Sequence, residues 1–354
     1  MTGGLGRLSG QGPALRRGWR LPSEAGALRR RAVRDGSLIA GWLVAAWIMV
    51  VIPAVGRSLG YDAYSYWFED LGLRYALAEG GLSTLGAFRY APPVGLLFSI
   101  FAVLPWWLFL WLWMLVSLAA ALWLGGRWTI PVLALPPVAL EIYHGNVHLL
   151  MAAAIVLGFR HPWTWAFVLL TKVTPGVGPL WFGIRREWRS LSIALGATAA
   201  VCVVSLVVAP ELWGRWLATV GSNAGWTADL SVPPPLPVRL VLATILVTWG
   251  ACTDRPWTVG VACMLGLPSL WPHGLVVALA ALPFLTGGSA LHKAVAAPVA
   301  TRELWSRRRF SAVTGLATAI GLSVVLLAGA ALERALLWAS AAILAVAGLP
   351  VPGD

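Results

Sequence analysis

The chain has 354 residues, of which 59% are hydrophobic and only 11% charged, and its mean hydropathy is +0.78. Soluble domains carry about 25% charged residues, so too little charge is present here to cover a surface that faces water. The 22 Trp and 38 Gly fit a membrane protein, because Trp favours membrane interfaces and Gly is frequent in membrane helices. Composition therefore excludes an ordinary soluble globule and predicts an all-α, polytopic membrane protein.

Twelve apolar runs qualify as membrane segments, provided that broken or half-buried helices are counted with the straight ones. A straight helix needs roughly 20 apolar residues to cross the hydrocarbon core. The predicted segments are 37–56, 92–104, 106–124, 128–140, 147–158, 163–182, 191–209, 238–251, 257–270, 274–285, 312–330 and 335–348.

The net charge of +12 is explained by the side of the membrane on which the basic residues fall. With a cytoplasmic amino terminus, the inner segments hold 17 of the 26 Lys and Arg residues, as the positive-inside rule requires. Inner basic residues also contact anionic headgroups. Charge thus predicts an even number of crossings in the plasma membrane and membrane lipid as a partner. Nucleic acid is not an expected partner.

Charge and hydropathy divide the chain into four parts. Residues 1–36 are rich in Gly and Arg and are predicted to form a disordered cytoplasmic tail. Residues 37–286 form the membrane core, 287–311 a basic cytoplasmic loop, and 312–354 a pair of carboxyl-terminal membrane helices with a packing role.

The two long outer segments, 57–91 and 210–237, are where chemistry is expected. The first carries Tyr61, Asp62 and Tyr64 in an aromatic and acidic run. Rings that stack on sugar faces beside a carboxylate would suit carbohydrate recognition. An interfacial aromatic belt with solvated acids explains the same composition, and the sequence leaves both interpretations open.

Lys172 lies near the middle of the predicted span 163–182. An ionisable group within a span is costly and is by default a functional candidate. Pro175 opens the helical hydrogen bonding beside it, and a buried cation next to a broken helix suits a phosphate. The alternatives are a lysine that snorkels to the interface or one that pairs with an acid such as Glu141.

The segments 128–140 and 147–158 are short, and 141–148 joins them. This pattern predicts a hairpin that dips into the membrane, with free amides near Asn146 that suit an anion. His144 and His148 lie four residues apart, which suggests zinc. However, Gly145 and Asn146 interrupt the helix, and no Glu occupies the position that a His-Glu-x-x-His site needs, so no metal site is expected.

His273 closes the segment 268–273 at an outer membrane boundary. It is suited either to a phosphate oxygen or to a helix cap.

Taken in order, these residues resemble the C superfamily of glycosyltransferases, in particular family 87, the polyprenyl-phosphate-mannose-dependent α-mannosyltransferases. The resemblance covers roughly 37–286. The residues that carry it are Asp62 in the first outer segment, Tyr90-Ala91-Pro92-Pro93 before the second span with Leu104-Pro105 after it, Gly145-Asn146, Lys172-Val173-Thr174-Pro175, and Pro268-Ser269-Leu270-Trp271 with His273.

The resemblance implies a fold of the same type and an inverting transfer of a sugar, with mannose the first expectation. The partners would be a polyprenyl-phosphate-linked donor and a glycolipid or cell-envelope glycan acceptor, at the outer face. Asp62 would be the single catalytic base, and Lys172, His273 and Asn146 would bind the donor phosphate. Tyr61, Tyr64, Arg89, Tyr90 and Trp271 would line the site. No metal and no other cofactor is expected.

Two other classes explain part of the pattern. A twelve-span lipid or sugar transporter, or flippase, would account for the hydropathy and for a lysine within a span. A structural partner of a cell-envelope synthase would need no site at all.

Overall fold

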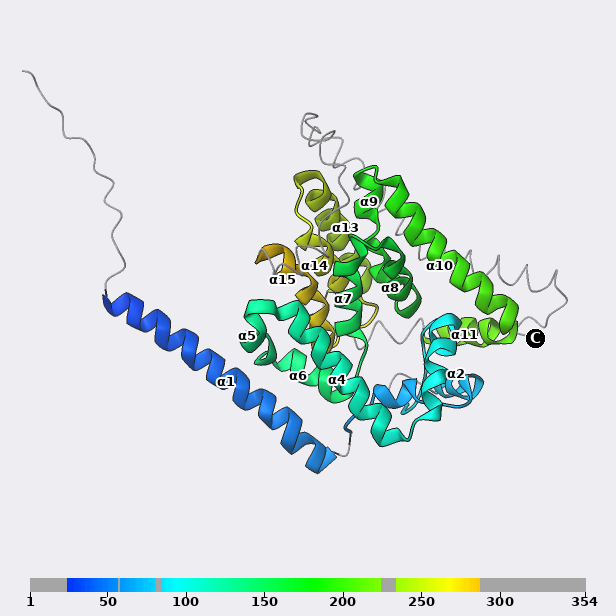
Figure 1. Cartoon of the computed structure of the whole chain (residues 1–354), viewed down its shortest axis with the longest axis horizontal. Coiled ribbons are helices and arrows are strands. Elements are labelled where there is room, and N and C mark those ends of the chain that lie inside the picture. Colours follow the sequence, from blue (N-terminus) through cyan, green and yellow to red (C-terminus); the bar gives the residue numbers. More distant parts are fainter. Residues whose placement is uncertain (1–23, 57, 81–83, 224–233, 287–354) are drawn as a thin grey trace, which may run out of the picture. The chain divides into compact units, whose positions relative to one another are not determined.

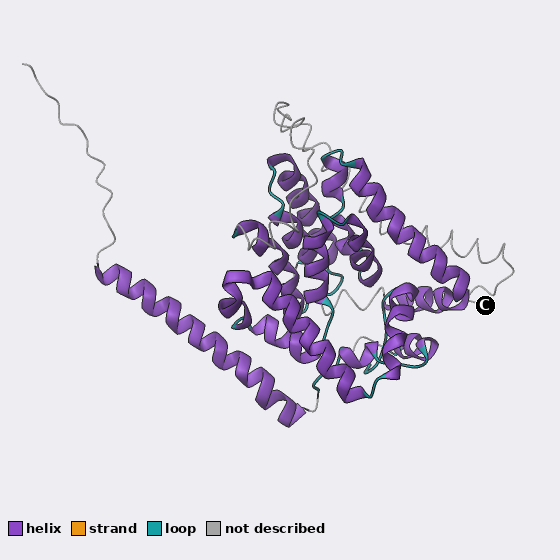
Figure 2. Ribbon diagram, in the orientation of Figure 1, coloured by secondary structure: helices purple, strands orange, loops and turns teal. Residues whose placement is uncertain are grey.

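The computed structural model describes residues 24–56, 58–80, 84–223 and 234–286. Every regular element in these ranges is a helix, as the ribbon in Figure 2 shows. The chain forms two compact units, 1–40 and 41–354, and the site described below belongs entirely to the second. The helical fold class therefore agrees with the prediction within the described ranges. The predicted basic loop 287–311 and the helix pair 312–354 lie outside them.

The first unit contributes the start of α1, which runs from Glu24 to Gly56. Residues 24–36 are therefore helical, although the sequence placed them in a disordered tail. The reason is local, because Ala, Leu and Arg dominate this stretch and are strong helix formers. Residues 1–23 lie outside the described ranges.

The second unit contains the remaining helices (Figure 1). In chain order they are η1 (Ala63–Tyr66), α2 (Leu71–Glu79), α3 (Pro92–Ser99), η2 (Ile100–Val103), α4 (Trp106–Gly125), η3 (Gly126–Trp128), α5 (Thr129–Leu133), α6 (Pro136–His144), α7 (His148–Gly158), η4 (Pro162–Thr164), α8 (Trp165–Thr171), η5 (Thr174–Val177), α9 (Leu180–Ile184), α10 (Trp188–Val208), α11 (Pro210–Asn223), α13 (Leu236–Thr253), α14 (Trp257–Leu265), η6 (Pro272–Ala281) and α15 (Leu282–Leu285).

Four helical stretches in the described ranges are long and apolar enough to cross a membrane. The bent pair of α6 and α7 makes a fifth if it counts as one span. The chain is thus a membrane protein, while the count of twelve segments stays a prediction, with its last two segments outside the described residues. The four stretches are Gly26–Pro53, Trp106–Leu133, Trp188–Val208 and Leu236–Thr253.

The outer segment 210–237, which the sequence presents as a loop, begins with helix α11. This helix is strongly amphipathic and packs against α2. Its Trp216 indole donates a hydrogen bond to the Arg89 carbonyl at 3.2 Å. A helix with one apolar face is stabilised by the surface on which that face packs, so α11 covers the first outer segment. Residues 224–233 of this segment lie outside the described residues.

The predicted hairpin is present, with a bend of 108° between α6 and α7. Two prolines open α6, where the missing N–H costs nothing. Gly145 ends it in the left-handed conformation with φ 68°, which favours glycine. Glu141 then caps α7 from the preceding helix, because its Oε1 accepts the amide hydrogens of His148 at 2.6 Å and Leu149 at 3.3 Å.

The predicted helix break beside Lys172 is also present. Helix α8 ends at Thr171, Lys172 is extended, and η5 starts at Thr174. Gly266 packs directly on this break, since a Cβ on it would lie 3.0 Å from the Thr174 carbonyl oxygen. The close approach links the break to the segment that leads into η6.

Arg239, in helix α13, holds the segment between α14 and η6 in place. Its side chain is fully buried and donates hydrogen bonds to four carbonyl oxygens. Those carbonyls belong to Pro234, Leu265, Leu267 and Pro268, at 2.7 to 3.1 Å. Helix η6 follows and packs against α6, α7 and α14, so the guanidinium fixes the entry to the helix that carries His273.

Replacing Arg239 with Met is expected to destabilise the protein by about 2–4 kcal/mol, because buried carbonyls lose charge-assisted hydrogen bonds. Thermal unfolding of the purified protein in detergent measures the effect. Arg127→Met is the matched control, since Arg127 is exposed and its guanidinium lies over the Trp128 ring. A melting temperature equal to that of the control would contradict the role given to Arg239.

Candidate active site

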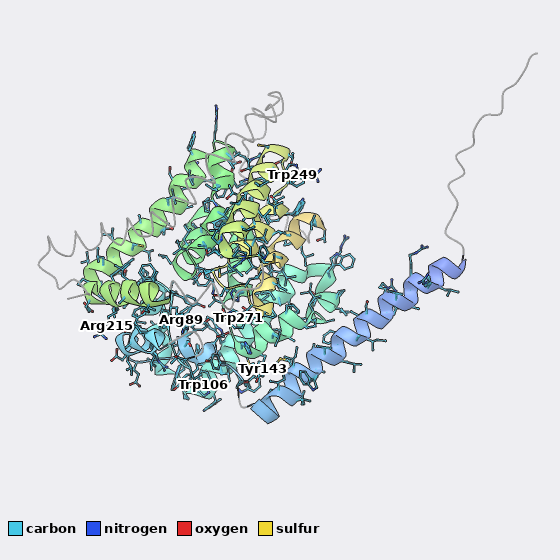
Figure 3. The ribbon with its side chains drawn as sticks, turned by 180° about the vertical axis from the view of Figure 1, so that it is seen from behind. Arg89, Trp106, Tyr143, Arg215, Trp249 and Trp271 are labelled. Carbon is cyan, nitrogen blue, oxygen red and sulfur yellow. The ribbon has the colours of Figure 1, made fainter. Side chains whose placement is uncertain are left out.

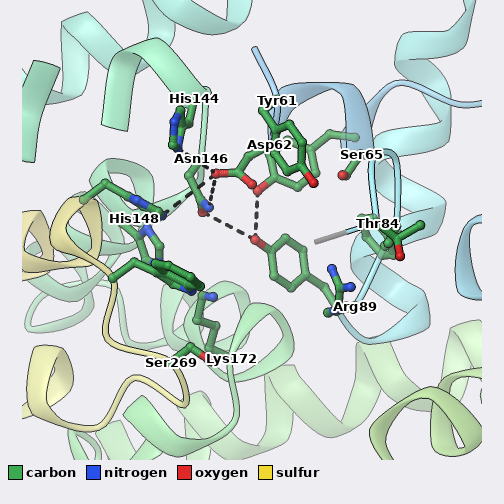
Figure 4. A pocket seen from close by; sticks show the side chains of 16 residues that line it. Tyr61, Asp62, Ser65, Thr84, Arg89, His144, Asn146, His148, Lys172 and Ser269 are labelled. Atoms are coloured by element: carbon green, nitrogen blue, oxygen red, sulfur yellow. Dashed lines mark hydrogen bonds and ion pairs between the residues drawn. The ribbon is translucent and has the colours of Figure 1, made fainter. Parts of the chain in front are cut away.

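A cavity of about 320 Å³ lies where four segments of the second unit meet (Figure 4). These are the first outer segment, the α6–α7 hairpin, the break after α8 and the stretch before η6. The lining residues are Tyr61, Asp62, Ser65, Tyr66, Thr84, Ala87, Phe88, Arg89, Tyr90, His144, Asn146, His148, Lys172, Ser269, Trp271 and His273. Its size falls in the usual range for a small-molecule site.

The backbone of the first outer segment is hydrogen-bonded to the hairpin. The amides of Gly60 and Asp62 donate to the carbonyls of Tyr143 and His144, at 2.8 and 2.9 Å. A Cβ on Gly145 would lie 2.7 Å from the Cβ of Ala63, so only glycine permits this contact. Asp62 is therefore held against the hairpin by main-chain bonds rather than carried on a free loop.

The Asp62 carboxylate is partly buried, with 24% of its side chain exposed. Its Oδ2 accepts a hydrogen bond of 2.8 Å from the Asn146 amide nitrogen. Asn146 Oδ1 in turn accepts the Val147 amide hydrogen at 2.7 Å and the Tyr90 hydroxyl at 3.5 Å. Both ends of the Asn146 side chain are thus engaged, and its amide orients the carboxylate.

Burial raises the pKa of Asp62 above its ordinary value, and the hydrogen bond from Asn146 opposes that rise. A carboxylate that is partly desolvated is a stronger base than a solvated one. The tyrosines behind it extend the network, since the hydroxyls of Tyr66 and Tyr90 lie 2.8 Å apart.

Five cationic or potentially cationic side chains face the same cavity. They are Arg89, His144, His148, Lys172 and His273. His273 Nε2 lies 3.9 Å from Asp62 Oδ2. The Lys172 ammonium lies 5.6 Å from the centroid of the Tyr90 ring. A carboxylate and several basic side chains therefore surround one space, in which an anion and a nucleophile can lie side by side.

The alternative in which Glu141 pairs with Lys172 is not what the structure shows. Glu141 is fully buried, and its Oε2 lies 3.0 Å from His148 Nδ1. Within the described ranges Lys172 forms no ion pair, and its ammonium faces the cavity. Sequence reasoning missed the bond between Glu141 and His148, because it considered Glu141 only as a partner for Lys172.

The histidines of the hairpin do not act as one pair. Instead, each joins a different group of potential ligands that includes His273. One group is Asp62, His144 and His273, and the other is Glu141, His148 and His273. The glycine and asparagine between His144 and His148 turn the chain, which is why the two side chains part.

Eight of the nine residues that the sequence proposed for the site line the cavity. They are Tyr61, Asp62, Arg89, Tyr90, Asn146, Lys172, Trp271 and His273. Figure 3 labels Arg89 and Trp271 in the reverse view.

Tyr64 is the exception, because it is not among the lining residues. Its ring packs edge-on against Trp106, with centroids 5.3 Å apart, and lies under the Arg74 guanidinium. Asp62 and Ser65, three residues apart at the start of η1, both line the cavity, as residues so spaced share a face of a 3₁₀ helix. Tyr64 instead packs between Trp106 and Arg74.

A comparison with known protein families assigns the chain that forms this cavity to a family. The sequence model of glycosyltransferase family 87 matches residues 88–300, which is more than half of the chain. The chain belongs to glycosyltransferase family 87. Neither the curated proteins nor the solved structures yield a match.

Membership of family 87, together with the apolar helices, makes the chain a membrane glycosyltransferase. The resemblance inferred from the motifs is thus confirmed at the level of the family. The matched range contains Arg89, Asn146, Lys172 and His273. Asp62 precedes it, so the place of Asp62 in the site rests on the geometry above.

Proposed function

We propose that this protein transfers a sugar, mannose in the first instance, from a polyprenyl-monophosphate donor to a lipid-linked or cell-envelope glycan acceptor, with inversion. The observation that carries the proposal is the convergence of Asp62, Lys172 and His273 on one cavity. Within the twelve-span topology predicted from charge, this cavity opens on the outer face of the plasma membrane.

Asp62 serves as the general base. It takes the proton of the acceptor hydroxyl as that oxygen attacks the anomeric carbon from the face opposite the phosphate. The bond between the anomeric carbon and the phosphate oxygen breaks, and polyprenyl phosphate leaves. A β-linked donor then gives an α-linked product. Phosphate is a good leaving group, so one carboxylate suffices, whereas glycoside hydrolysis ordinarily uses two.

Lys172 and His273 hold the donor phosphate. The phosphate gains charge as the bond to the sugar breaks, and a preorganised ammonium group together with an imidazole N–H donor stabilises that charge. Asn146, first expected to bind the phosphate, is better suited to positioning the base, because its amide nitrogen already donates to Asp62. Tyr61, Arg89, Tyr90 and Trp271 form the walls against which sugar and acceptor lie.

An apolar cavity of about 510 Å³ adjoins the polar one and suits the isoprenoid chain. Both cavities use the same two stretches of chain. Tyr90 and Lys172 line the polar cavity, whereas Pro93 and Leu170 line the apolar one. The Ala91 amide donates to the Leu170 carbonyl at 3.0 Å and joins the stretches. A charged headgroup and its lipid chain can therefore occupy neighbouring sites.

Filling the apolar cavity is expected to raise the KM for a long-chain donor about tenfold or more. Ala153 lines this cavity, and Ala153→Trp fills part of it with an indole ring. Each isoprene unit that is displaced into water loses roughly 1.5–3 kcal/mol of hydrophobic binding free energy. A donor with a single short isoprenoid unit should be affected much less. Ala119→Trp on the exposed side of α4 is the matched control. Equal KM changes for long and short donors would place the lipid chain elsewhere.

The proposal as a whole is tested with membranes that contain the protein, radiolabelled polyprenyl-phosphate mannose and a panel of lipid and glycan acceptors. Label transferred to an acceptor supports it, and a product with α-configuration supports inversion. Movement of the donor across sealed vesicles, with no transfer to any acceptor, would favour the transporter instead.

A further inference from the structure

The polar cavity also brings together three potential metal-ligand atoms, of which only the one on His144 belongs to a side chain with no role in the proposed transfer. Asp62 Oδ2, His144 Nδ1 and His273 Nε2 come from three different segments. His144 Nδ1 lies 3.8 Å and His273 Nε2 lies 3.9 Å from the same carboxylate oxygen. The centroids of the two imidazole rings lie 5.3 Å apart.

These separations are too long for direct hydrogen bonds but suit three ligands around one ion. In the described part of the chain, neither imidazole forms a side-chain hydrogen bond with protein. Zinc binds imidazole nitrogen and carboxylate oxygen at about 2.0–2.2 Å, so tetrahedral ligands lie roughly 3.4 Å apart. The two distances to Asp62 Oδ2 need to contract by only about half an ångström, and all three ligand atoms lie within 4.8 Å of one another. The cavity leaves room for a fourth ligand.

We propose that Asp62, His144 and His273 form a binding site for a divalent transition metal ion of the Zn²⁺ type, and that its occupancy inhibits the transferase. The ligand set of two imidazoles and one carboxylate favours Zn²⁺ over Mg²⁺ or Ca²⁺, which prefer oxygen ligands. An ion on Asp62 Oδ2 takes the lone pair that the base needs, and it also occupies His273. This inhibitory consequence rests on the proposed function, whereas binding itself does not.

The neighbouring group of Glu141, His148 and His273 is less suited to a metal ion. Glu141 already accepts hydrogen bonds from the amides of His148 and Leu149, and its second oxygen bonds the His148 ring. Both Glu141 and His148 are almost fully buried. Their role is to hold the α7 end of the hairpin, on which the Asp62 partner Asn146 lies.

Binding is measured first, without any substrate. The full chain in nanodiscs is washed with chelator and titrated with Zn²⁺ by calorimetry, and with Co²⁺ by visible absorption, which reports tetrahedral coordination. We expect one ion per chain. His144→Gln and Asp62→Asn should each weaken binding by at least about 10–100-fold, the loss that even an outer-shell substitution causes. His161→Gln, an exposed histidine outside the cavity, is the control.

Transfer is measured next, and wild type should be inhibited by Zn²⁺ while His144→Gln should resist it. Wild-type affinity retained in both His144→Gln and Asp62→Asn, or lost only in His148→Gln, would overturn the site. Binding without inhibition, or activation by Zn²⁺, would overturn the inhibitory role. Because binding is measured without donor or acceptor, it can succeed when no transfer is found, which separates this proposal from the proposed function.

Discussion

Replacing Asp62 with Asn is expected to lower the rate of sugar transfer by about 10²–10⁴-fold, the usual contribution of a general base. Asn keeps the size of the side chain and still offers an oxygen to the Asn146 amide, so the hairpin contact survives. It cannot accept the proton of the acceptor hydroxyl. The loss should therefore appear in kcat, with little change in the KM for the donor.

Glu69→Gln is the matched control for that experiment. Glu69 belongs to the same outer segment and is exposed, so its loss of charge should leave transfer almost unchanged. The melting temperatures of both variants, compared with that of the wild type, show whether either substitution impairs folding. Transfer at the wild-type rate in Asp62→Asn would refute the base assignment, even if other parts of the site proved correct.

Replacing Lys172 with Met is expected to lower kcat by about 10²–10³-fold, similar to the removal of one preorganised donor to a developing anion. Met conserves most of the volume and deletes the charge, so the helix break after α8 should persist. The donor phosphate gains charge only as its bond to the sugar breaks. The effect should thus be larger on kcat than on donor binding.

Lys172→Arg tests the role of the charge itself and should recover part of the lost activity, with the remainder reflecting the different geometry of guanidinium. Arg160→Met removes an exposed charge at the end of α7 and serves as the control. If Lys172→Arg is as impaired as Lys172→Met, or if Arg160→Met is equally impaired, the lysine does not act through its charge on the phosphate.

Local features of the site were predictable wherever they depend on short-range chemistry. The hairpin followed from two short apolar runs around a Gly-Asn pair, and the break beside Lys172 followed from Pro175. The start of α1 and the helix α11 were not predicted correctly. The amphipathic period of α11 is present in the sequence and was missed, whereas its packing on α2 is visible only in the structure.

Contacts that form only after the chain has turned could not be predicted from the sequence. Nothing in the sequence near Glu141 indicates that it caps α7 and bonds His148, because the chain must first turn by 108°. Arg239 is similar, since a lone arginine in an apolar run looks like a topology signal until its four carbonyl partners are in place. The placement of Tyr64 away from the cavity depends on its contacts with Trp106 and Arg74, which are also distant in sequence.

By itself the sequence determined that this is a helical membrane protein with few ionisable residues in its apolar segments, because hydropathy and charge act locally on each segment. Its motifs also determined the glycosyltransferase family. Only the tertiary structure decided that Asp62, Asn146, Lys172 and His273 share one cavity. These residues are far apart in the chain, and their meeting depends on backbone bonds, a bent hairpin and a buried guanidinium that form only when the helices pack.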